Sequence, residues 1–226
     1  MVRVCRDRSL SVGEKPGGCD GGTASVAAVP SNPAPDGLLA LLSARTGHFP
    51  LESGHHGELW LDLDSLFFEP AAVEPFAHRL ADLVRPHAPD VVCGPLVGGA
   101  YLAQVVAARL GARFCHAERT STGDGGLYAA TYQLPRALVP HLAGLRVAVV
   151  DDVVNAGSAV RATLAALAQA GARPVAIGAL LALGRTPGRV AASAGLPLEA
   201  VATRDNEIWE PDRCPRCAAG VPLQQP

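Results

Sequence analysis

Apolar residues follow two different spacings along the chain, which predict strands and helices in alternation. Mostly apolar runs of strand length occur at 90–96, 113–117, 144–150 and 174–183. Helix patterns lie between them, over 71–86, over 99–110 and after residue 155, where Val160, Leu164 and Leu167 share one face. Because strands buried on both faces are continuously apolar, this order predicts an α/β fold with a central, mostly parallel sheet flanked by helices.

The two ends of the chain have different patterns. Residues 1–35 are rich in Gly, Pro, Ser and Ala without a period, which predicts a disordered extension. Asp36 is placed to cap a short helix through Arg45, and 58–64 ("ELWLDLD") alternates as a half-buried strand does. Residues 206–226 predict an irregular tail. We therefore expect one domain over 36–205 between an extension and a tail.

Composition and charge exclude several classes of function. The net charge is −2, which gives no electrostatic basis for binding nucleic acid or an anionic membrane surface. Eighteen arginines accompany a single lysine, Lys15, and the lysine-containing P-loop motif is absent. No apolar run reaches the ~18 residues of a membrane span, and the first residues lack an apolar leader segment. A cytoplasmic protein is expected.

The segment 147–159 ("VAVVDDVVNAGSA") predicts a ligand site. Asp151 and Asp152 end a buried strand, and ligands of α/β sheets gather at the carboxyl ends of strands. The small residues Asn155–Ala159 then open a helix, whose N-terminal N–H groups favour a phosphate. Two carboxylates suit vicinal hydroxyls, directly or through Mg²⁺. A phosphate beside a diol describes a ribose 5-phosphate.

This segment resembles the ribose-phosphate site of type I phosphoribosyltransferases, and most of all that of the orotate enzymes, in which Thr occupies the places of Asn155 and Ser158. Further segments resemble that family in the same order. Residues 49–67 are similar to its N-terminal hood, 91–103 to its pyrophosphate loop, 114–126 to its mobile loop and 180–185 to its hood-facing strand. The resemblance implies the type I fold, with a small hood built from the N- and C-terminal segments.

The family's activity is implied by the same resemblance. It is the Mg²⁺-dependent transfer of phosphoribosyl from phosphoribosyl pyrophosphate to a nucleobase, with orotate as the first expectation, by a homodimer that serves pyrimidine biosynthesis. Asp151, Asp152 and Arg119 would be catalytic. The implied substrate-binding residues are Leu96, Val97, Gly98 and Gly99 for pyrophosphate, Asn155, Ala156, Gly157, Ser158 and Ala159 for the 5-phosphate, and Ser53, His55 and Arg185 towards the base.

The chain departs from the orotate pattern wherever that pattern has lysine. Glu52 replaces the hood lysine, Gly98 replaces the pyrophosphate-loop lysine, and the segment resembling the mobile loop keeps Arg119 as its cation. Two alternatives therefore stay open. One is an acceptor other than a pyrimidine, and the other is a module that binds phosphoribosyl pyrophosphate without turnover.

Cys214 and Cys217 have the spacing of half a zinc site. A tetrahedral site needs four ligands, and the chain has no second C-x-x-C. A histidine or a second subunit would have to complete the site; otherwise the two thiols form a solvent-exposed pair.

Overall fold

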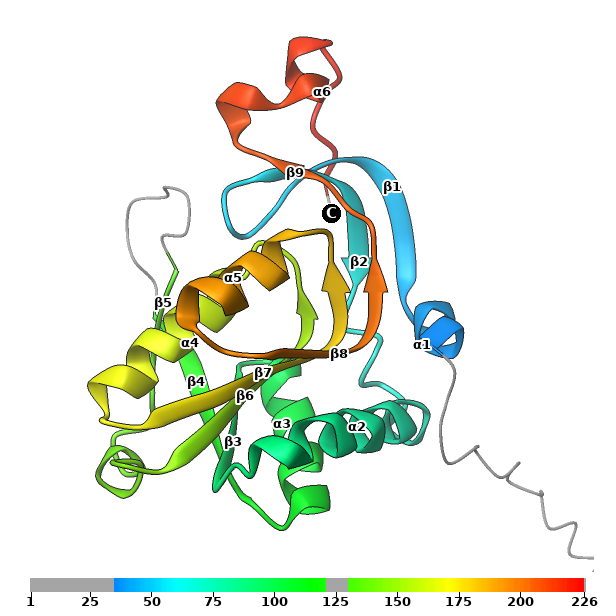
Figure 1. The fold of residues 1–226 in the computed structure, drawn as a ribbon. Coiled ribbons are helices and arrows are strands. Elements are labelled where there is room, and N and C mark those ends of the chain that lie inside the picture. The colour runs from blue at the N-terminus through cyan, green and yellow to red at the C-terminus, as the bar shows by residue number, and fades with distance from the viewer. Residues whose placement is uncertain (1–34, 121–129, 226) are drawn as a thin grey trace, which may run out of the picture.

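The computed structural model describes residues 35–120 and 130–225, and it divides them between a central sheet and a small hood above it (Figure 1). The predicted extension lies outside these residues, apart from Pro35. Within the described part of the chain, no helix combines the length and apolar character that crossing a membrane requires.

The central sheet has six strands in the order β5-β4-β3-β6-β7-β8. Five of them are mutually parallel, and β5 pairs antiparallel with β4 at one edge. The strands are β3 (Val91–Pro95), β4 (Arg113–Thr120), β5 (Thr131–Gln133), β6 (Arg146–Val154), β7 (Arg173–Leu183) and β8 (Leu198–Arg204). The predicted mostly parallel sheet is thus present, and the carboxyl ends of its strands point towards the hood (Figure 1).

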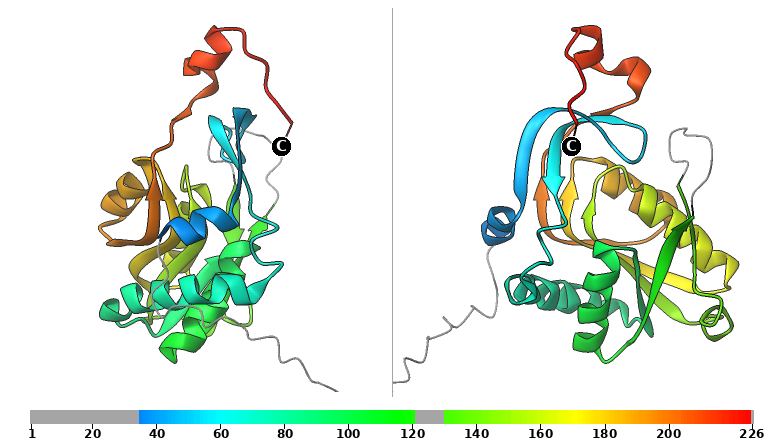
Figure 2. Two further views of the ribbon diagram at one scale, coloured as in Figure 1. Left: turned by 90° about the vertical axis from the view of Figure 1, so that its right-hand side faces the viewer. Right: turned by 180° about the vertical axis from the view of Figure 1, so that it is seen from behind.

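Helices cover both faces of this sheet (Figure 2). They are α1 (Pro35–Leu41), α2 (Pro70–Val84), α3 (Gly98–Leu110), α4 (Ser158–Gln169) and α5 (Thr186–Ala194). Because successive strand residues point to opposite faces, the core divides into two clusters. Ala148 and Val150 pack in the cluster that α1, α2 and α3 complete, whereas Val147 and Val149 pack in the cluster of α4 and α5.

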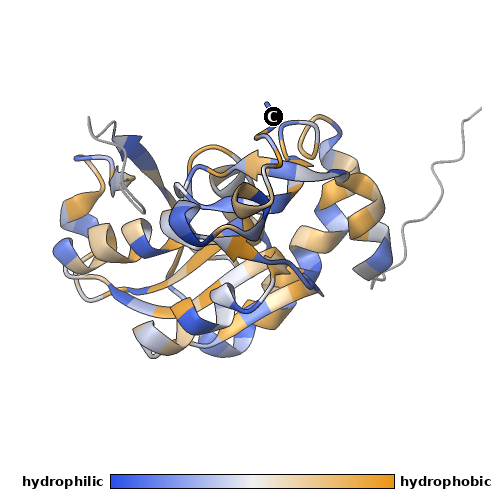
Figure 3. Cartoon of the chain, turned by 90° about the horizontal axis from the view of Figure 1, so that it is seen from above, coloured by the Kyte–Doolittle hydropathy of each residue, from blue (hydrophilic) through white to orange (hydrophobic). Residues whose placement is uncertain are grey.

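Small aliphatic residues build this core. Aromatic residues make up only 4% of the chain, and the completely buried side chains of the central strands are mainly Val, Ala, Leu and Ile. Viewed from above, apolar colour runs along the central strands and the inner faces of the helices (Figure 3).

Small side chains also let segments approach closely. A Cβ at Gly94 of β3 would lie 2.0 Å from the carbonyl oxygen of Gly99, so α3 begins directly against the strand.

The hood is a separate three-stranded antiparallel sheet in the order β1-β2-β9. Strands β1 (Ser43–Pro50) and β2 (His56–Asp62) form a hairpin, and the two-residue β9 (Ile208–Trp209) pairs with the start of β2. After β9 the chain makes a 3-10 turn (Pro211–Arg213) and the short α6 (Pro215–Ala218) above the hairpin (Figure 1). The N- and C-terminal segments therefore build the hood together.

Three local expectations were wrong. Helix α1 begins at Pro35, so Asp36 lies in its first turn rather than capping it, and the helix ends at Leu41 rather than Arg45 because residues from Ser43 onward pair with β2. The central sheet does not end with β7, since α5 and the parallel strand β8 follow it. Residues 206–226 are not irregular throughout, because the hairpin edge gives β9 a partner. All three errors concern segments whose conformation depends on a partner distant in sequence.

Candidate active site

A cavity of about 520 Å³ lies between the hood and the carboxyl ends of the central strands. Its wall on the hood side comes from 51–53 and 59–64, and its floor comes from the β3–α3 connection (95–99) and the end of β6 with the following turn (151–159). Segments that are far apart in sequence, and that the sequence predicted to share one site, therefore line the same space.

The acid pair lies inside the last part of β6, which continues to Val154 rather than ending before the acids. Asp151 and Asp152 are only 8% and 7% exposed. The backbone N–H of Asp152 donates to Oδ1 of Asp151 at 3.1 Å, and the N–H of Val153 donates to Oδ1 of Asp152 at 2.7 Å. One oxygen of each carboxylate is thus held by the backbone.

Burial raises the pKa of both carboxyls. The pKa of Asp151 is raised well above its ordinary value, first by loss of hydration and then by the neighbouring Asp152. Two adjacent buried carboxylates are costly to ionise together, so the pair keeps a proton to a higher pH than exposed carboxyls do. Such a pair fits Mg²⁺ or a sugar diol as a ligand.

Glycines allow the β3–α3 connection to approach the acids. A Cβ at Gly98 would lie 1.9 Å from Oδ2 of Asp152, and a Cβ at Gly99 would lie 2.6 Å from Oδ1 of Asp151. Any side chain at residue 98 would therefore meet the carboxylate. The glycine in place of the family's usual lysine is a steric requirement of this arrangement.

The turn after β6 leads directly into α4. Gly157 has φ +75°, which only glycine adopts easily, and a Cβ there would lie 2.7 Å from Cγ2 of Val190. Ser158 begins the helix, and its hydroxyl oxygen is buried without a hydrogen-bond partner in the described structure. A buried hydroxyl without a partner is uncommon and points to a missing acceptor or donor.

Asn206 also contacts this turn, and no sequence pattern predicted that contact. Its Nδ2 donates to Oδ1 of Asn155 at 3.1 Å. Asn206 follows β8, 51 residues further along the chain. A lone asparagine in a polar stretch has no periodicity or motif, so only the folded chain reveals this contact.

The hood contributes Ser53 and Glu52 to the cavity. Ser53 is buried, and its Oγ lies 3.1 Å from Nδ1 of the buried His55. Glu52 forms an ion pair with Arg119 of β4, at 3.4 Å between the carboxylate and the guanidinium. Arg119 itself does not line the cavity and reaches it only through Glu52.

Arg185 does not lie where the sequence placed it. It is exposed at the start of α5 and is not among the residues that line the cavity. The cause is Gly184, whose φ of +64° turns the chain directly after β7 and whose N–H donates to the carbonyl of Arg204. Leu183 is the last residue of β7 that lines the cavity.

Residues 121–129, in the segment resembling a mobile loop, lie outside the described residues.

Comparison with known proteins gives consistent results. Residues 66–199 match a family described as the phosphoribosyl transferase domain. An orotate phosphoribosyltransferase of Thermotoga maritima is 33% identical over 180 residues, which are 80% of this chain and 89% of the relative. One of Thermus thermophilus is 34% identical over 179 residues, 79% of this chain and 91% of the relative.

Solved structures show the same fold. An orotate phosphoribosyltransferase from Aeropyrum pernix, 24% identical, superposes with a TM-score of 0.56 and covers 73% of this chain and 88% of its own. An adenine phosphoribosyltransferase from Thermoanaerobacter pseudethanolicus, 17% identical, has a TM-score of 0.61 and covers 76% of this chain and all of its own (100%). The predicted fold class is confirmed.

Replacing Asp151 by Asn should stabilise the fold without ligands. The folded chain keeps the carboxyl proton to a higher pH than the unfolded chain does, so wild-type stability falls as pH rises above the ordinary Asp range. The melting temperature of Asp151→Asn should therefore exceed that of the wild type, and the difference should grow as the pH rises above about 4, the ordinary pKa of Asp. Each kcal/mol corresponds to about 2–4 °C in a chain of this size.

Asp62→Asn is the matched control, because Asp62 lines the same cavity but is exposed. Its melting temperature should follow that of the wild type across the pH range. A difference for Asp151→Asn that is zero, negative or independent of pH would contradict the account of the acid pair.

Proposed function

The chain belongs to the phosphoribosyl transferase domain family, and we propose that it transfers phosphoribosyl from phosphoribosyl pyrophosphate to orotate, forming orotidine 5′-monophosphate and pyrophosphate. The observation that carries this proposal is the buried acid pair of β6 at the floor of the cavity, directly followed by the small-residue turn into α4. The acceptor comes from the relatives, whose printed name is orotate phosphoribosyltransferase.

The donor's ribose 5-phosphate fits the turn into α4. Backbone N–H groups at the start of a helix offer hydrogen bonds and a favourable partial charge to a phosphate. Ser158 adds its hydroxyl, which has no partner within the described chain. The contact between Asn206 and Asn155 holds the beginning of this turn. We assign the 5-phosphate to Asn155–Ala159.

The ribose hydroxyls fit the acid pair. Asp151 and Asp152 accept hydrogen bonds from the diol, and in their ionised form they stabilise the positive charge that develops at C1 as pyrophosphate leaves. Mg²⁺ suits the same oxygens, and when bound it supplies positive charge for the donor's pyrophosphate. The backbone of Leu96–Gly99, drawn close to the acids by its glycines, faces the pyrophosphate.

The base fits under the hood, beside Ser53 and Glu52. Glu52 would repel an anionic base, but its charge is partly balanced by Arg119. The side chains of this ion pair are 47% (Arg119) and 78% (Glu52) exposed, and such exposed pairs contribute only ~0–1 kcal/mol. Arg119 can therefore leave Glu52 for the pyrophosphate at little cost. Arg119 would then supply the positive charge beside the pyrophosphate that lysines supply in the family pattern.

The decisive experiment measures pyrophosphate release from phosphoribosyl pyrophosphate and Mg²⁺ with orotate and with a panel of other bases. We expect release with orotate, and we expect Asp152→Asn to reduce it by at least ~10²-fold, as removal of a single electrostatic stabiliser does. Release with another base alone would show that this base, and not orotate, is the acceptor. Donor binding without release for any base would show that the protein is a sensing module and not an enzyme.

Removing the charge of Glu52 should favour anionic substrates. We expect Glu52→Gln to lower the KM for orotate by about 2- to 10-fold, because one repulsive charge at the cavity wall is lost and Arg119 is released. Glu118→Gln, next to Arg119 on β4 but outside the cavity, is the matched control and should leave KM unchanged. An equal or higher KM for Glu52→Gln would show that Glu52 does not face the base.

We also propose that the protein is a homodimer. Large apolar side chains are exposed beside the cavity mouth, with Phe68 85%, Val97 59% and Tyr101 51% accessible, and Tyr101 contacts the ring of Phe67. Such a group of exposed apolar residues is typical of an interface. Light scattering should give twice the chain mass of 23.2 kDa, and Phe68→Glu should shift it towards the monomer. A wild-type monomer would contradict the proposal.

A cytoplasmic location, and the expected absence of nucleic-acid and membrane partners, stay predictions.

A further inference from the structure

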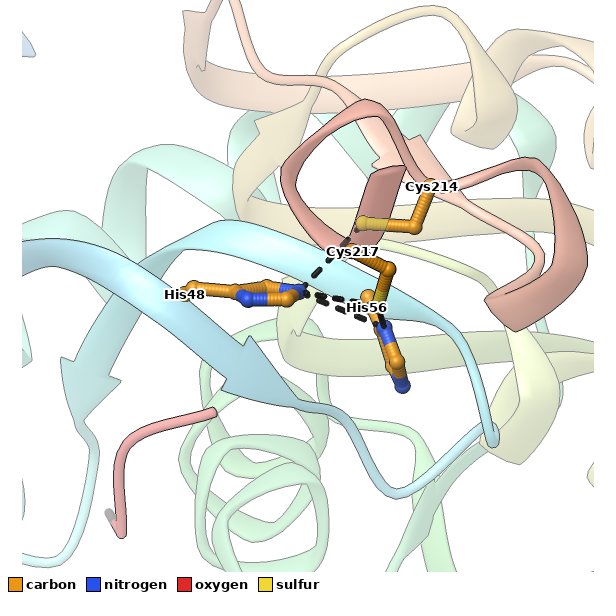
Figure 4. A group of neighbouring side chains, drawn as sticks. All are labelled: His48, His56, Cys214 and Cys217. Carbon is orange, nitrogen blue, oxygen red and sulfur yellow. Dashed lines mark hydrogen bonds between the residues drawn. The ribbon is translucent and has the colours of Figure 1, made fainter. Parts of the chain in front are cut away.

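Two histidines and two cysteines meet at the top of the hood, away from the cavity (Figure 4). His48 comes from β1, His56 begins β2, and Cys214 and Cys217 flank the start of α6. One ligand atom of each residue lies within 4.8 Å of all the others. His48 and Cys214 are buried, whereas Cys217 is exposed, so the expected solvent-exposed thiol pair is wrong for Cys214.

Four of the six distances between these ligand atoms are close to those of a tetrahedral metal site, and all six are within 4.8 Å. Nε2 of His48 lies 3.3 Å from Nδ1 of His56 and 3.3 Å from Sγ of Cys214. Sγ of Cys217 lies 3.2 Å from Nδ1 of His56 and 3.8 Å from Nε2 of His48. Zinc bonds of about 2.0–2.1 Å to nitrogen and about 2.3 Å to sulfur place two nitrogens about 3.3 Å apart, and a nitrogen and a sulfur about 3.6 Å apart.

The contact between His48 and the backbone of the tail orients the cluster. Nδ1 of His48 lies 2.8 Å from the carbonyl oxygen of Val221, and because a carbonyl only accepts, this nitrogen carries the proton. In the neutral ring Nε2 then has only a lone pair, which points at three potential ligand atoms. A backbone carbonyl that fixes the histidine tautomer in this way is typical of a metal-binding histidine.

We propose that His48, His56, Cys214 and Cys217 bind one structural Zn²⁺. Both thiols release their protons to solvent on binding, so two thiolates and two neutral imidazoles balance the charge of the ion. Tetrahedral sulfur and nitrogen ligands favour zinc over the hard cations Mg²⁺ and Ca²⁺, which take oxygen. Four protein ligands close the site, which is the pattern of structural rather than catalytic zinc.

This site would fix the hood. Apart from the zinc ligands, the described part of the tail is attached to the hairpin by the two residue pairs of β9, by the N–H of Gln224 donating to the carbonyl of His48 at 2.7 Å, and by the half-buried ion pair of Arg216 with Glu58. His48 and His56 also bracket residues 51–53, which line the cavity. Zinc would therefore hold both the tail and the wall of the cavity. The proposal is independent of the acceptor and of turnover.

The test begins with the full chain purified under reducing conditions with zinc in the growth medium. Elemental analysis should find about one zinc per chain, held through dialysis. Replacing zinc by Co²⁺ should give the strong visible absorption of a tetrahedral site together with sulfur-to-cobalt charge-transfer bands. Both readouts are independent of enzymatic activity.

Variants then assign the ligands. His48→Ala and Cys217→Ser should each lose most of the zinc, and their melting temperatures should fall to that of the wild type treated with a chelator. Cys217→His restores a ligand at an exposed position and should retain the metal. His78→Gln, an exposed histidine on α2, and the double variant Cys5→Ser/Cys19→Ser should both keep one zinc per chain.

Three results would overturn the proposal. The first is wild-type protein with reduced thiols and no bound zinc when zinc is supplied. The second is a disulfide between Cys214 and Cys217 under these reducing conditions, seen as a mass lower by two hydrogens. The third is zinc that survives in both His48→Ala and Cys217→Ser, or that is lost in the Cys5→Ser/Cys19→Ser variant.

Discussion

Two adjacent carboxylates buried at the end of β6 impose the main constraint on this site. Lost hydration opposes their ionisation and raises the pKa of both, and the neighbouring Asp152 raises that of Asp151 further. Backbone N–H groups hold one oxygen of each, and a ligand that brings hydroxyl donors or positive charge would favour the ionised pair. Stability without ligand and affinity for ligand are therefore opposed at these two positions, as is common in functional sites.

The same constraint accounts for the neighbouring glycines. The β3–α3 connection approaches the acids so closely that neither Gly98 nor Gly99 has room for a Cβ. A Cβ at residue 98 would require the carboxylate of Asp152 to move, and Arg119 does not line the cavity. Under the proposed function, binding of a polyanion would therefore rely on backbone N–H groups, one α-helix N-terminus and metal more than on lysine side chains.

The hood depends on a different kind of interaction. Its hairpin and the tail share few backbone hydrogen bonds, since β9 contributes only two residue pairs. The cluster of His48, His56, Cys214 and Cys217 joins them at one point, and the cavity wall at 51–53 lies between its two histidines. A metal there would hold the part of the cavity wall at 51–53, whereas Leu59 of the same wall already belongs to the hydrophobic core.

The sequence alone determined the parallel strands β3, β4, β6 and β7 and the helices α2, α3 and α4, because each is a continuous stretch with its own period. It also predicted a ribose-phosphate segment at the end of β6 from a local motif. Tertiary structure alone decided the rest. Strand β9 and residue Asn206 act through partners far away in the chain, and Gly184 turns Arg185 away from the cavity. The C-x-x-C could be read locally, but its two histidines lie more than 150 residues earlier. Contacts between distant segments leave no local period, so only folding brings these residues together.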